Sequence, residues 1–580
     1  MSNWIERANI YHIYTLNFCG AEKFRKDYKE PEPSSGGRIL KVLSWIPHIV
    51  KTGFNAVLFS PVFESAEHGY DTSDFFKIDA RLGTNDEFML VCEELHKNGI
   101  RVILDGVFNH VGRDFWAFRD LQQKGEKSEY KDWFAGVNFG NRSVFGDGFS
   151  YEGWSGHYNL VKLNLYNERV VNHIFNAVKL WYKDFGIDGI RFDAADCLTD
   201  DFIKRFRNFA KGTLNEDFWL MGEIIHGNYA RWANAEMFDS VTNYQCHKGI
   251  YSSHNDKNYF EISSSFDQQK NQYGNLYLYN FVDNHDVGRI ASKITDKAHL
   301  ECVYTMLYTM YGVPSVYYGS EFGIEGNKGQ GADADLPLRP NLNLDNIHGR
   351  DDKLLEHITK LGEIRKSVDI LQSGFYDKVY LDNKTFVYKR ELSGKVCYIA
   401  FNIDDKPYTF SIKSTTEYWL DCLSGRRYKG AEGKVNIELA PNTSGIYLEE
   451  HNYRAAFGDR PHTEAIFPVP HETEIEVEIE VAPNPVKELL NPTAKTIPVS
   501  DIIPLGVKDN RKIVVGATYH HFKGGDYKVL LLAKDHEDAS PLVVYMALSG
   551  EGDTWVRPLD NFLEEVNDHG NIKERFTLVN

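Results

Sequence analysis

The sequence has few cysteines, and their arrangement suits neither a metal site nor a disulfide framework. There are 7 in 580 residues, an odd number spread without motif spacing, and no Cys-x-x-Cys pair occurs. Zinc ribbons use such pairs, and small disulfide-rich secreted domains use even sets at regular spacing. The pattern therefore predicts reduced thiols and argues against a zinc ribbon.

The sequence also lacks the features of exported or membrane-bound proteins. Residues 1–7, Met-Ser-Asn-Trp-Ile-Glu-Arg, contain no basic segment followed by an apolar run. No stretch reaches the roughly 18 apolar residues that a membrane-spanning helix needs. We therefore expect no signal peptide and no membrane partner, and we predict that the protein is cytoplasmic.

An excess of positive charge is missing as well. Lys and Arg total 65 against 83 Asp and Glu, which gives a formal net charge of −18. Nucleic-acid binding through phosphate neutralisation is therefore disfavoured, whereas binding of a neutral polysaccharide is unaffected. Aromatic residues make up 14% of the chain. Sugar-binding clefts use such rings, but any single ring is more often part of a core.

What the sequence does contain is a set of carboxylates placed directly after short apolar runs. Each such segment ends a predicted strand and begins a polar turn. The four segments are residues 104–110, 189–194, 220–224 and 281–286. The carboxyl ends of the strands in a parallel β/α barrel converge on one rim, where active sites are built.

Two of these carboxylates suit the breaking of a glycosidic bond, which needs a general acid and a nucleophile or stabiliser. Arg191 precedes Asp193 by two residues, so in a strand both face the same side, and the guanidinium is predicted to lower the pKa of Asp193. Glu223 is flanked by apolar residues such as Met221 and Ile224, which predicts a raised pKa and a general-acid role. Alternatively, an Asp after a strand only caps the next helix, but four such segments in order favour the functional interpretation.

In order and spacing, these segments resemble the conserved regions of the α-amylase family, glycoside hydrolase family 13, over residues 5–450. The resemblance implies that Asp193 is the catalytic nucleophile and Glu223 the general acid/base. It implies that Asp286 is the third carboxylate, which binds sugar hydroxyls and stabilises the transition state.

The same resemblance implies a set of substrate-binding residues around the reacting sugar. Residues 68–72 match the loop after the second strand, in which Tyr70 would be an aromatic platform and Asp71 a polar contact. Arg191, His110 and His285 match further contacts to the sugar. Two other matching residues, Asp105 and Asn109, mainly hold the architecture of the site in this family.

The subgroup is less clear from the motifs. Residues 160–164 and 222–226 resemble the neopullulanase and cyclomaltodextrinase form, whereas residues 282–286 are closer to ordinary α-amylases. Asp196 and Cys197 stand where many α-amylases have a Lys-His pair that helps to bind calcium. Asn109 alone is weak support for a cation that needs six or more oxygens. We therefore predict no metal and no cofactor, with calcium only weakly supported.

The chain is too long for one typical domain, and the pattern divides it into four parts. Residues 1–367 are predicted to form an α/β fold, a (β/α)8 TIM barrel with an inserted domain at about residues 111–160. Its strands are predicted at residues 10–14, 56–60, 101–105, 189–193, 219–223, 238–243, 279–283 and 313–318. A helix is predicted to begin at Thr84-Asn85 and to end at Asn98-Gly99. A disordered loop is the alternative for residues 111–160, but four aromatic clusters in it favour a folded domain.

The remaining parts are predicted from alternating patterns and proline content. Residues 368–450 read as a C-terminal β-sandwich. Residues 451–510 read as a proline-rich linker in which residues 474–481 alternate strictly between acidic and apolar. Residues 511–580 form a β-rich module that resembles a small bacterial domain of unknown function, for which we predict a small β-barrel. Its residues Tyr519, His521 and Trp555 are either a binding face or, more often for such residues, core and turn positions.

Taken together, the sequence predicts a retaining hydrolase of α-1,4-glucans such as maltooligosaccharides or starch, acting by double displacement. Transglycosylation on the same substrates is an alternative, because a sugar hydroxyl can replace water in the second step. A non-catalytic glucan-binding or interaction protein is a weaker alternative, since all three carboxylates are present. The expected partner is the α-glucan, and the oligomeric state stays open.

Overall fold

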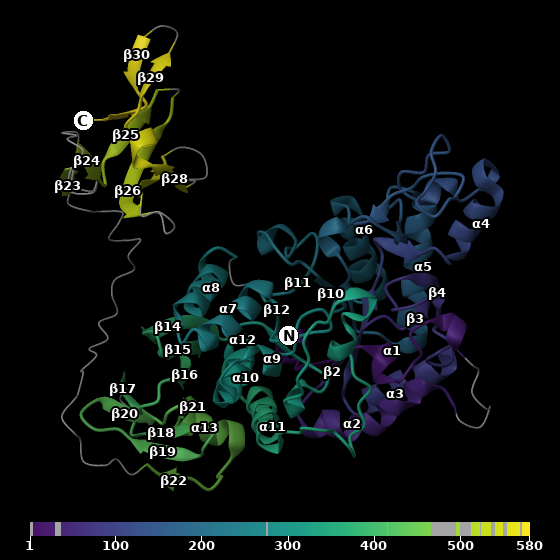
Figure 1. The fold of residues 1–580 in the computed structure, drawn as a ribbon. Helices are drawn as coiled ribbons and strands as arrows, with labels where there is room; N and C mark the ends of the chain where they lie inside the picture. Colours follow the sequence, from purple (N-terminus) through teal and green to yellow (C-terminus); the bar gives the residue numbers. More distant parts are fainter. Residues whose placement is uncertain are drawn as a thin grey trace. The chain divides into compact units, whose positions relative to one another are not determined.

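The computed structural model divides the chain into two compact units, Met1–Glu476 and Val477–Asn580 (Figure 1). It describes residues 4–28, 36–273, 276–414, 416–465, 495–498, 512–522, 524–534, 540–548, 554–568 and 571–579. No helix of the described residues is both long and apolar enough to span a membrane.

The first unit is built on the predicted barrel of eight parallel strands. The strands in chain order are β1 (Ile10–Ile13), β2 (Ala56–Phe59), β5 (Arg101–Gly106), β9 (Gly189–Phe192), β10 (Trp219–Gly222), β11 (Ser240–Val241), β12 (Tyr279–Phe281) and β13 (Val313–Tyr317). Each pairs with the next, β1 also pairs with β13, and a parallel bridge between Thr242 and Tyr279 joins β11 to β12. Most are continuous apolar runs because both of their faces are buried. All eight predicted strands are confirmed, although the sixth is shorter than predicted.

Helices surround the barrel, and their ends follow the sequence signals. α3 (Asn85–Lys97) begins with a capping box, in which Thr84 and Glu87 bond each other's backbone N–H groups, and it confirms the predicted helix. The other helices are α1 (Thr15–Phe18), α2 (Lys41–Lys51), α5 (Glu168–Phe185), α6 (Asp200–Phe209), α7 (Tyr244–Asn255), α8 (Phe260–Asn271), α9 (Ile290–Lys293), α10 (Leu300–Thr309), α11 (Asp352–Ser367) and α12 (Asp369–Ser373).

The long connection after β5 is a folded domain and not a disordered loop. It contains β6 (His110–Gly112), α4 (Trp116–Lys124), β7 (Gly153–Trp154) and β8 (His157–Lys162). The ring of Phe118 lies 5.1 Å from that of Phe134 and 5.0 Å from that of Tyr151, so the aromatic clusters form its core. A separate hairpin of β3 (Phe63–Ser65) and β4 (Thr72–Ile78) carries the loop that contains Tyr70.

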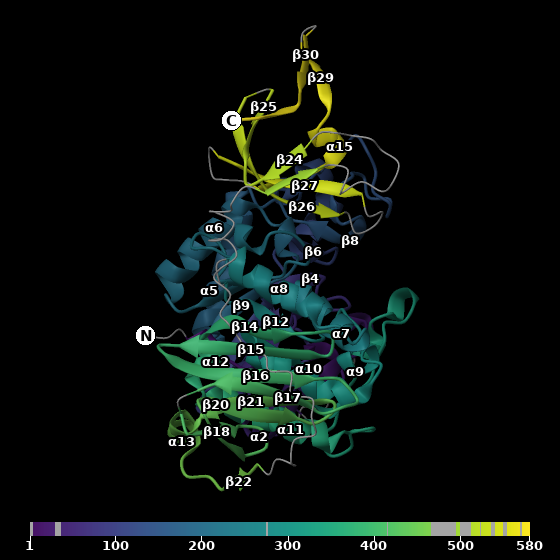
Figure 2. The same cartoon turned by 90° about the vertical axis from the view of Figure 1, so that its left-hand side faces the viewer.

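The C-terminal part of the first unit is the predicted sandwich. One sheet contains β14 (Phe375–Leu381), β15 (Thr385–Leu392), β16 (Lys395–Asn402), β21 (Thr443–Glu449), β18 (Tyr418–Asp421), β19 (Arg426–Lys429) and β22 (Thr463–Glu464), and the other contains β17 (Tyr408–Lys413) and β20 (Lys434–Leu439). Figure 2 shows β14, β15 and β16 side by side. The domain is tied to α10, since Tyr388 Oη lies 2.6 Å from Thr309 Oγ1.

This domain extends beyond the predicted boundary at residue 450. α13 (Glu450–Phe457) buries Tyr453, which is 5% exposed. Further along the chain, β22 pairs with β19, and Arg460 forms an ion pair with Glu363 of α11. The packing of the first unit therefore continues to residue 464.

The second unit is a separate β-rich module. Its main sheet has the order β28 (Thr554–Pro558), β27 (Pro541–Ala547), β26 (Asp526–Lys534), β25 (Thr518–His521) and β31 (Phe576–Leu578). The remaining elements are β23 (Lys495–Pro498), β24 (Lys512–Val515), α15 (Leu559–Phe562), β29 (Glu565–Asp568) and β30 (Asn571–Glu574). Over the described residues this sheet is open, with β28 and β31 at its edges, where the sequence predicts a small barrel. The predicted alternation at residues 474–481 lies outside the described residues.

Two of the three residues singled out in this module belong to its packing. Tyr519 is 3% exposed, and its hydroxyl accepts a hydrogen bond from the backbone N–H of Val514 at 3.0 Å. The ring of His521 packs against that of Phe576 at 4.7 Å. Trp555 is 53% exposed.

We expect a chain that ends after residue 465 to fold and to keep the activity on short oligosaccharides that the sequence predicts. The reason is that it retains α13, β22 and the Arg460–Glu363 ion pair. Its melting temperature should lie within about 3 °C of the barrel transition of the full chain, the change expected for about 1 kcal/mol. A chain that ends after Tyr453 is the control, and its melting temperature should fall much further. Inactivity of the longer truncation on short substrates would show that the second unit is needed for catalysis.

Candidate active site

The predicted carboxylates meet at the carboxyl ends of the barrel strands. Asp105 is the next-to-last residue of β5, and Asp193 follows β9 directly. Glu223 follows β10, and Asp286 lies in the loop after β12. A side chain at Gly222, just before Glu223, would place its Cβ 2.7 Å from the ring of Phe238. This close packing explains why glycine precedes the acid.

Arg191 joins three of the carboxylates. Its Nη1 lies 2.7 Å from both oxygens of Asp105 and 3.2 Å from Asp193 Oδ1. Its Nη2 lies 2.7 Å from Glu223 Oε1. All four side chains are at least mostly buried, and that of Asp105 is 0% exposed. One guanidinium therefore compensates three acids, which sequence spacing alone did not predict.

The predicted direction of the Asp193 pKa is wrong. Burial raises the pKa of Asp193 well above its ordinary value, and the nearby carboxylates of Glu223 and Asp105 add to this against the opposing effect of Arg191. The physical reason is that Arg191 is shared. Its shortest contacts are to Asp105 and Glu223, so Asp193 receives only part of its charge.

The surroundings of Glu223 are more polar than its apolar neighbours in the sequence predict. In addition to Arg191, the backbone N–H of Ala194 donates to Glu223 Oε2 at 3.1 Å, and Tyr244 Oη lies 3.5 Å from Oε1. Ala194 has a φ of 43°, a left-handed conformation that is unfavourable for a residue with a side chain. This strained backbone after Asp193 turns an amide toward Glu223.

Asp286 lies in a cationic environment of its own. His285 Nε2 lies 3.0 Å from Asp286 Oδ2, and Arg339 Nη2 lies 3.1 Å from Oδ1. Burial alone would raise the pKa of Asp286, but His285, Arg339 and Arg191 bring it well below its usual value. The pKa of Asp286 is therefore shifted in the opposite direction to that of Asp193.

Tyr70 and the two histidines complete the predicted cluster. The rings of Tyr70 and His285 stack at 5.5 Å, and Tyr70 Oη lies 3.0 Å from Asp105 Oδ2 and 2.6 Å from His285 Nε2. His110 Nε2 lies 3.9 Å from Asp193 Oδ2, and burial lowers the pKa of His110 to about 3. Within the part of the chain that the structure describes, His110 Nε2 and His285 Nδ1 are buried without a hydrogen-bond partner.

Asp71 is the exception among the predicted site residues. Its carboxylate accepts hydrogen bonds from the backbone N–H groups of Ala66, Glu67 and His68 at 2.8–3.1 Å. Its side chain is 7% exposed. The structure therefore places Asp71 inside the loop that carries Tyr70, where it holds the loop backbone.

Two residues of the site had no signal that sequence reasoning used. Arg339, 53 residues after Asp286, also donates from Nε to the carbonyl oxygen of His285 at 3.1 Å and packs on the ring of Tyr14 at 4.3 Å. Tyr244 begins α7, and its hydroxyl also accepts a hydrogen bond from Asn284 Nδ2 at 3.3 Å. Both reach the site only through the closure of the barrel.

Comparison with known proteins agrees with this geometry. The family described as "Alpha amylase, catalytic domain" matches residues 23–370, which is more than half of the chain. The chain belongs to the α-amylase family. As a member of this family of glycoside hydrolases, it is a glycosidase.

Individual relatives cover most of the first unit of this α-amylase family member. Neopullulanase 2 of Thermoactinomyces vulgaris is 30% identical over 469 residues, 76% of this chain and 77% of that protein. The intracellular maltogenic amylase of Bacillus subtilis is 26% identical over 424 residues, 69% of each protein. A solved cyclomaltodextrinase has a TM-score of 0.67 at 25% identity and covers 77% of this chain and 78% of its own. Residues 517–578 match a "protein of unknown function" family, DUF1653.

We expect the stability of this α-amylase family member to depend only weakly on calcium. Asp196 and Cys197 stand where many family members have the Lys-His pair that helps to bind calcium. Addition of a chelator should leave the melting temperature unchanged. A sharp fall that calcium reverses would contradict this prediction, because a ligand bound only to the native state raises its stability.

Proposed function

We propose that this chain hydrolyses α-1,4-glucosidic bonds of maltooligosaccharides and related glucans with net retention of anomeric configuration. The observation that carries the proposal is the contact of one guanidinium, that of Arg191, with both Asp193 and Glu223. Carboxyl groups bridged in this way are close together, as in retaining enzymes, whose carboxyls lie about 5–5.5 Å apart. Inverting enzymes need a wider gap, because a water molecule must fit between the sugar and the base.

The reaction would follow two displacements. Asp193 attacks the anomeric carbon while the bond to the leaving oxygen breaks and Glu223 gives its proton to that oxygen. Water then attacks the same carbon, Glu223 takes up its proton, and the bond to Asp193 breaks.

The other site residues support binding of the reacting sugar. The stacked rings of Tyr70 and His285 offer an apolar face for a pyranose, and the ionised Asp286 offers an acceptor for its hydroxyls. His110 lies beside Asp193, with its Nε2 3.9 Å from Asp193 Oδ2, and His285 lies beside Asp286, with its Nε2 3.0 Å from Asp286 Oδ2, so both rings stand next to the carboxylates that would face the reacting sugar. Asp286 also lies where its negative charge would stabilise an oxocarbenium-like transition state.

The relatives support a substrate range of short or cyclic glucans. The names neopullulanase, maltogenic amylase and cyclomaltodextrinase belong to proteins that match 76%, 69% and 77% of this chain. The name of the Bacillus subtilis relative, an intracellular enzyme, supports our prediction of a cytoplasmic location.

The test is the release of reducing ends by the purified full chain from maltoheptaose, with starch, pullulan and β-cyclodextrin in parallel. We expect turnover of maltoheptaose and of at least one other substrate. Products longer than the substrate would show transglycosylation, the alternative fate of the same intermediate. No turnover of any of the four would overturn the proposal.

The pH profile of kcat/KM should be bell-shaped, with an acid limb above the ordinary aspartate pKa of 3.8. The reason is that Asp193 must be ionised to attack, and its pKa is raised. Activity should therefore begin to fall at a pH above that at which an ordinary aspartate is protonated. The limbs belong to the coupled cluster and not to single residues. An acid limb at or below 3.8 would contradict the raised pKa of Asp193.

A further inference from the structure

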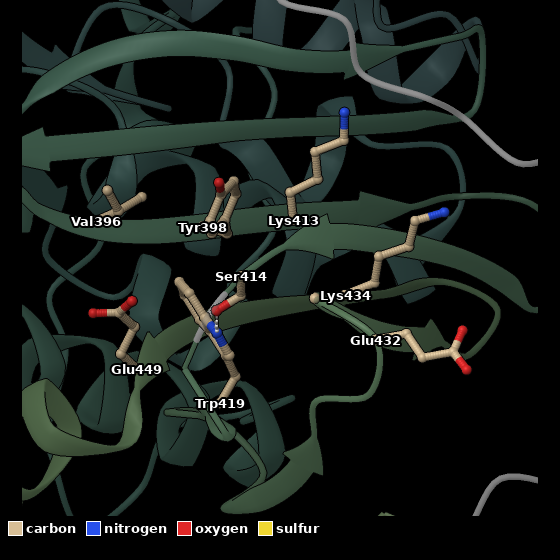
Figure 3. Close-up of a pocket in the computed structure, with 9 residues that line it drawn as sticks. Val396, Tyr398, Lys413, Ser414, Trp419, Glu432, Lys434 and Glu449 are labelled. Atoms are coloured by element: carbon tan, nitrogen blue, oxygen red, sulfur yellow. Dashed lines mark hydrogen bonds between the residues drawn. The ribbon is translucent and has the colours of Figure 1, made fainter.

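The groove on the C-terminal sandwich, shown in Figure 3, does not offer its tryptophan to a ligand. Trp419 is 2% exposed, and its Nε1–H donates to Ser414 Oγ at 2.8 Å, the contact drawn as a dashed line. Trp419 therefore presents neither a ring face nor a free indole N–H. Two buried residues of the barrel, Asp283 and Arg289, carry a further role instead, next to the loop that holds Asp286.

Asp283 ties together the two ends of the loop that carries Asp286. It is the second residue after β12, and its Oδ2 accepts a hydrogen bond at 2.8 Å from the backbone N–H of Ile290, where α9 begins. The same oxygen accepts a hydrogen bond from Ser320 Oγ at 2.8 Å. Asp283 is 1% exposed, and a hydrogen bond in buried surroundings is stronger than one in water. The loop is thus closed on itself and joined to the segment that follows β13.

Arg289 joins the same loop to two other segments of the chain. It is 0% exposed, and its Nη1 donates to the carbonyl oxygen of Tyr318 at 2.8 Å and to Ser320 Oγ at 2.9 Å. Its Nη2 donates to the carbonyl oxygen of Leu338, the residue directly before Arg339, at 2.9 Å. A buried guanidinium has lost its hydration and depends on these three acceptors. It therefore fixes the positions of the loop, of the segment after β13 and of residue 338 relative to one another.

These contacts hold both partners of the ion pair between Asp286 and Arg339. Arg289 follows Asp286 by three residues in the chain, and it is bonded to the residue before Arg339. Arg339 Nη2 in turn lies 3.1 Å from Asp286 Oδ1. A shift of either partner would move the carboxylate of Asp286. Displacement of a group at a reacting centre by about 1 Å can cost about 100-fold in rate.

We propose that Arg289 is a positioning residue for Asp286, assisted by Asp283 and Ser320. This inference rests on the proposed function, in which Asp286 stabilises the transition state. Arg289 is fully buried, and both of its Nη atoms are used on carbonyl and hydroxyl oxygens of the protein, so it acts through the loop and through Arg339. If Arg289 only stabilised the fold, its loss would affect the enzyme equally with and without the carboxylate of Asp286.

A double-mutant cycle of Arg289 with Asp286 tests the proposal. The measured quantity is kcat/KM on an aryl α-maltoside, whose good leaving group keeps slow variants measurable. We expect Arg289→Met to lower kcat/KM by about 100-fold in the otherwise wild-type enzyme. In the Asp286→Asn background the same substitution should change kcat/KM by about twofold or less, because the group that Arg289 positions is already lost. Ser320→Ala removes one hydrogen-bonded hydroxyl and should lower kcat/KM by about tenfold in the first background only.

Arg365→Met is the matched control. Arg365 is also 0% exposed, and it also donates to carbonyl oxygens, from Nη1 to Leu371 at 2.9 Å and from Nη2 to Gly312 at 2.8 Å. Gly312 directly precedes β13, so this arginine lies at the end of the barrel opposite to the carboxylates. Arg365→Met should lower the melting temperature as Arg289→Met does. At a temperature where both variants are folded, it should change kcat/KM by about twofold or less.

The outcomes separate this inference from the proposed function. The positioning role is overturned if the falls caused by Arg289→Met in the two backgrounds differ by less than about tenfold, as independent sites require. It is also overturned if Arg365→Met lowers kcat/KM as much as Arg289→Met does. If Arg289→Met does not fold, equal falls for Ser320→Ala in the two backgrounds overturn it. In each of these cases the wild-type enzyme still cleaves maltoheptaose. If the wild-type enzyme cleaves no α-glucan, the proposed function fails, and this inference fails with it.

Discussion

Asp193→Gly is expected to lower kcat on maltoheptaose by about 10,000-fold or more, because it removes the group that forms the covalent intermediate. Glu223→Ala should lower kcat by about 100- to 10,000-fold, the range of general acid–base catalysis. The melting temperature of each variant should be within a few degrees of that of the parent, or higher. The reason is that each substitution removes one buried negative charge from a cluster of three acids that share one cation. The measurement is steady-state turnover with thermal melting of the same samples.

Adding azide to the reactions of the two variants distinguishes the nucleophile from the general acid/base. With an aryl α-maltoside, whose leaving group needs no proton, Glu223→Ala still forms the intermediate on Asp193. Azide then replaces water, and the α-maltosyl azide forms after two inversions. In Asp193→Gly, azide attacks the substrate directly once, and the β-maltosyl azide forms. The opposite pairing of products and variants would reverse our assignment of nucleophile and acid.

Arg191→Met is expected to have the largest effect on stability. It leaves Asp105, Asp193 and Glu223 buried without their shared cation, and removing one partner of a buried ion pair typically costs about 3–5 kcal/mol. The matched control is Arg205→Met, because the Arg205–Glu168 pair is at the surface, with side chains 32% and 68% exposed. Such pairs contribute about 0–1 kcal/mol. Urea unfolding of the three proteins measures the difference.

The loss of stability in Arg191→Met should grow as the pH rises. Burial already raises the pKa of Asp105 and Asp193 in the folded enzyme, and loss of Arg191 raises both further. The native state then binds more protons than the unfolded state above the unfolded pKa of 3.8, so stability falls as the pH rises. Arg191→Met should therefore lose more stability between pH 5 and pH 8 than the parent does. Equal stability of variant and parent at pH 8 would show that Arg191 does not compensate the cluster.

The sequence was sufficient to place the barrel strands and the carboxylates at their ends. An apolar run followed by a polar turn is a local signal, and a parallel barrel brings all such turns to one rim. The electrostatics of the rim were not predictable in the same way. Arg191 and Asp105 are 86 residues apart in the chain, so their contact has no local sequence signal. Because Arg191 also pairs with Asp105, it lowers the pKa of Asp193 less than the spacing of Arg191 and Asp193 alone predicts.

Other features escaped prediction for related reasons. Arg339 has no pattern around it that marks a site, and its contact with Asp286 joins positions 53 residues apart in the chain. The alternating pattern predicts an end of the C-terminal domain at residue 450, because β22 contains only two residues, too few to show an alternation. The match of Asp71 to a family position predicts a polar contact with the sugar. In the structure its carboxylate instead accepts hydrogen bonds from three backbone N–H groups of its own loop, which the sequence does not reveal.

The central claim is that Asp193 and Glu223 carry out two displacements on an α-glucan. The most direct measurement is proton NMR of the wild-type reaction with maltoheptaose in its first minutes, before the anomers of the new reducing ends equilibrate. The account predicts that the α-anomer appears first and that the β-anomer follows by mutarotation. Initial formation of the β-anomer would mean a single displacement by water and would contradict the assignment of Asp193 as nucleophile.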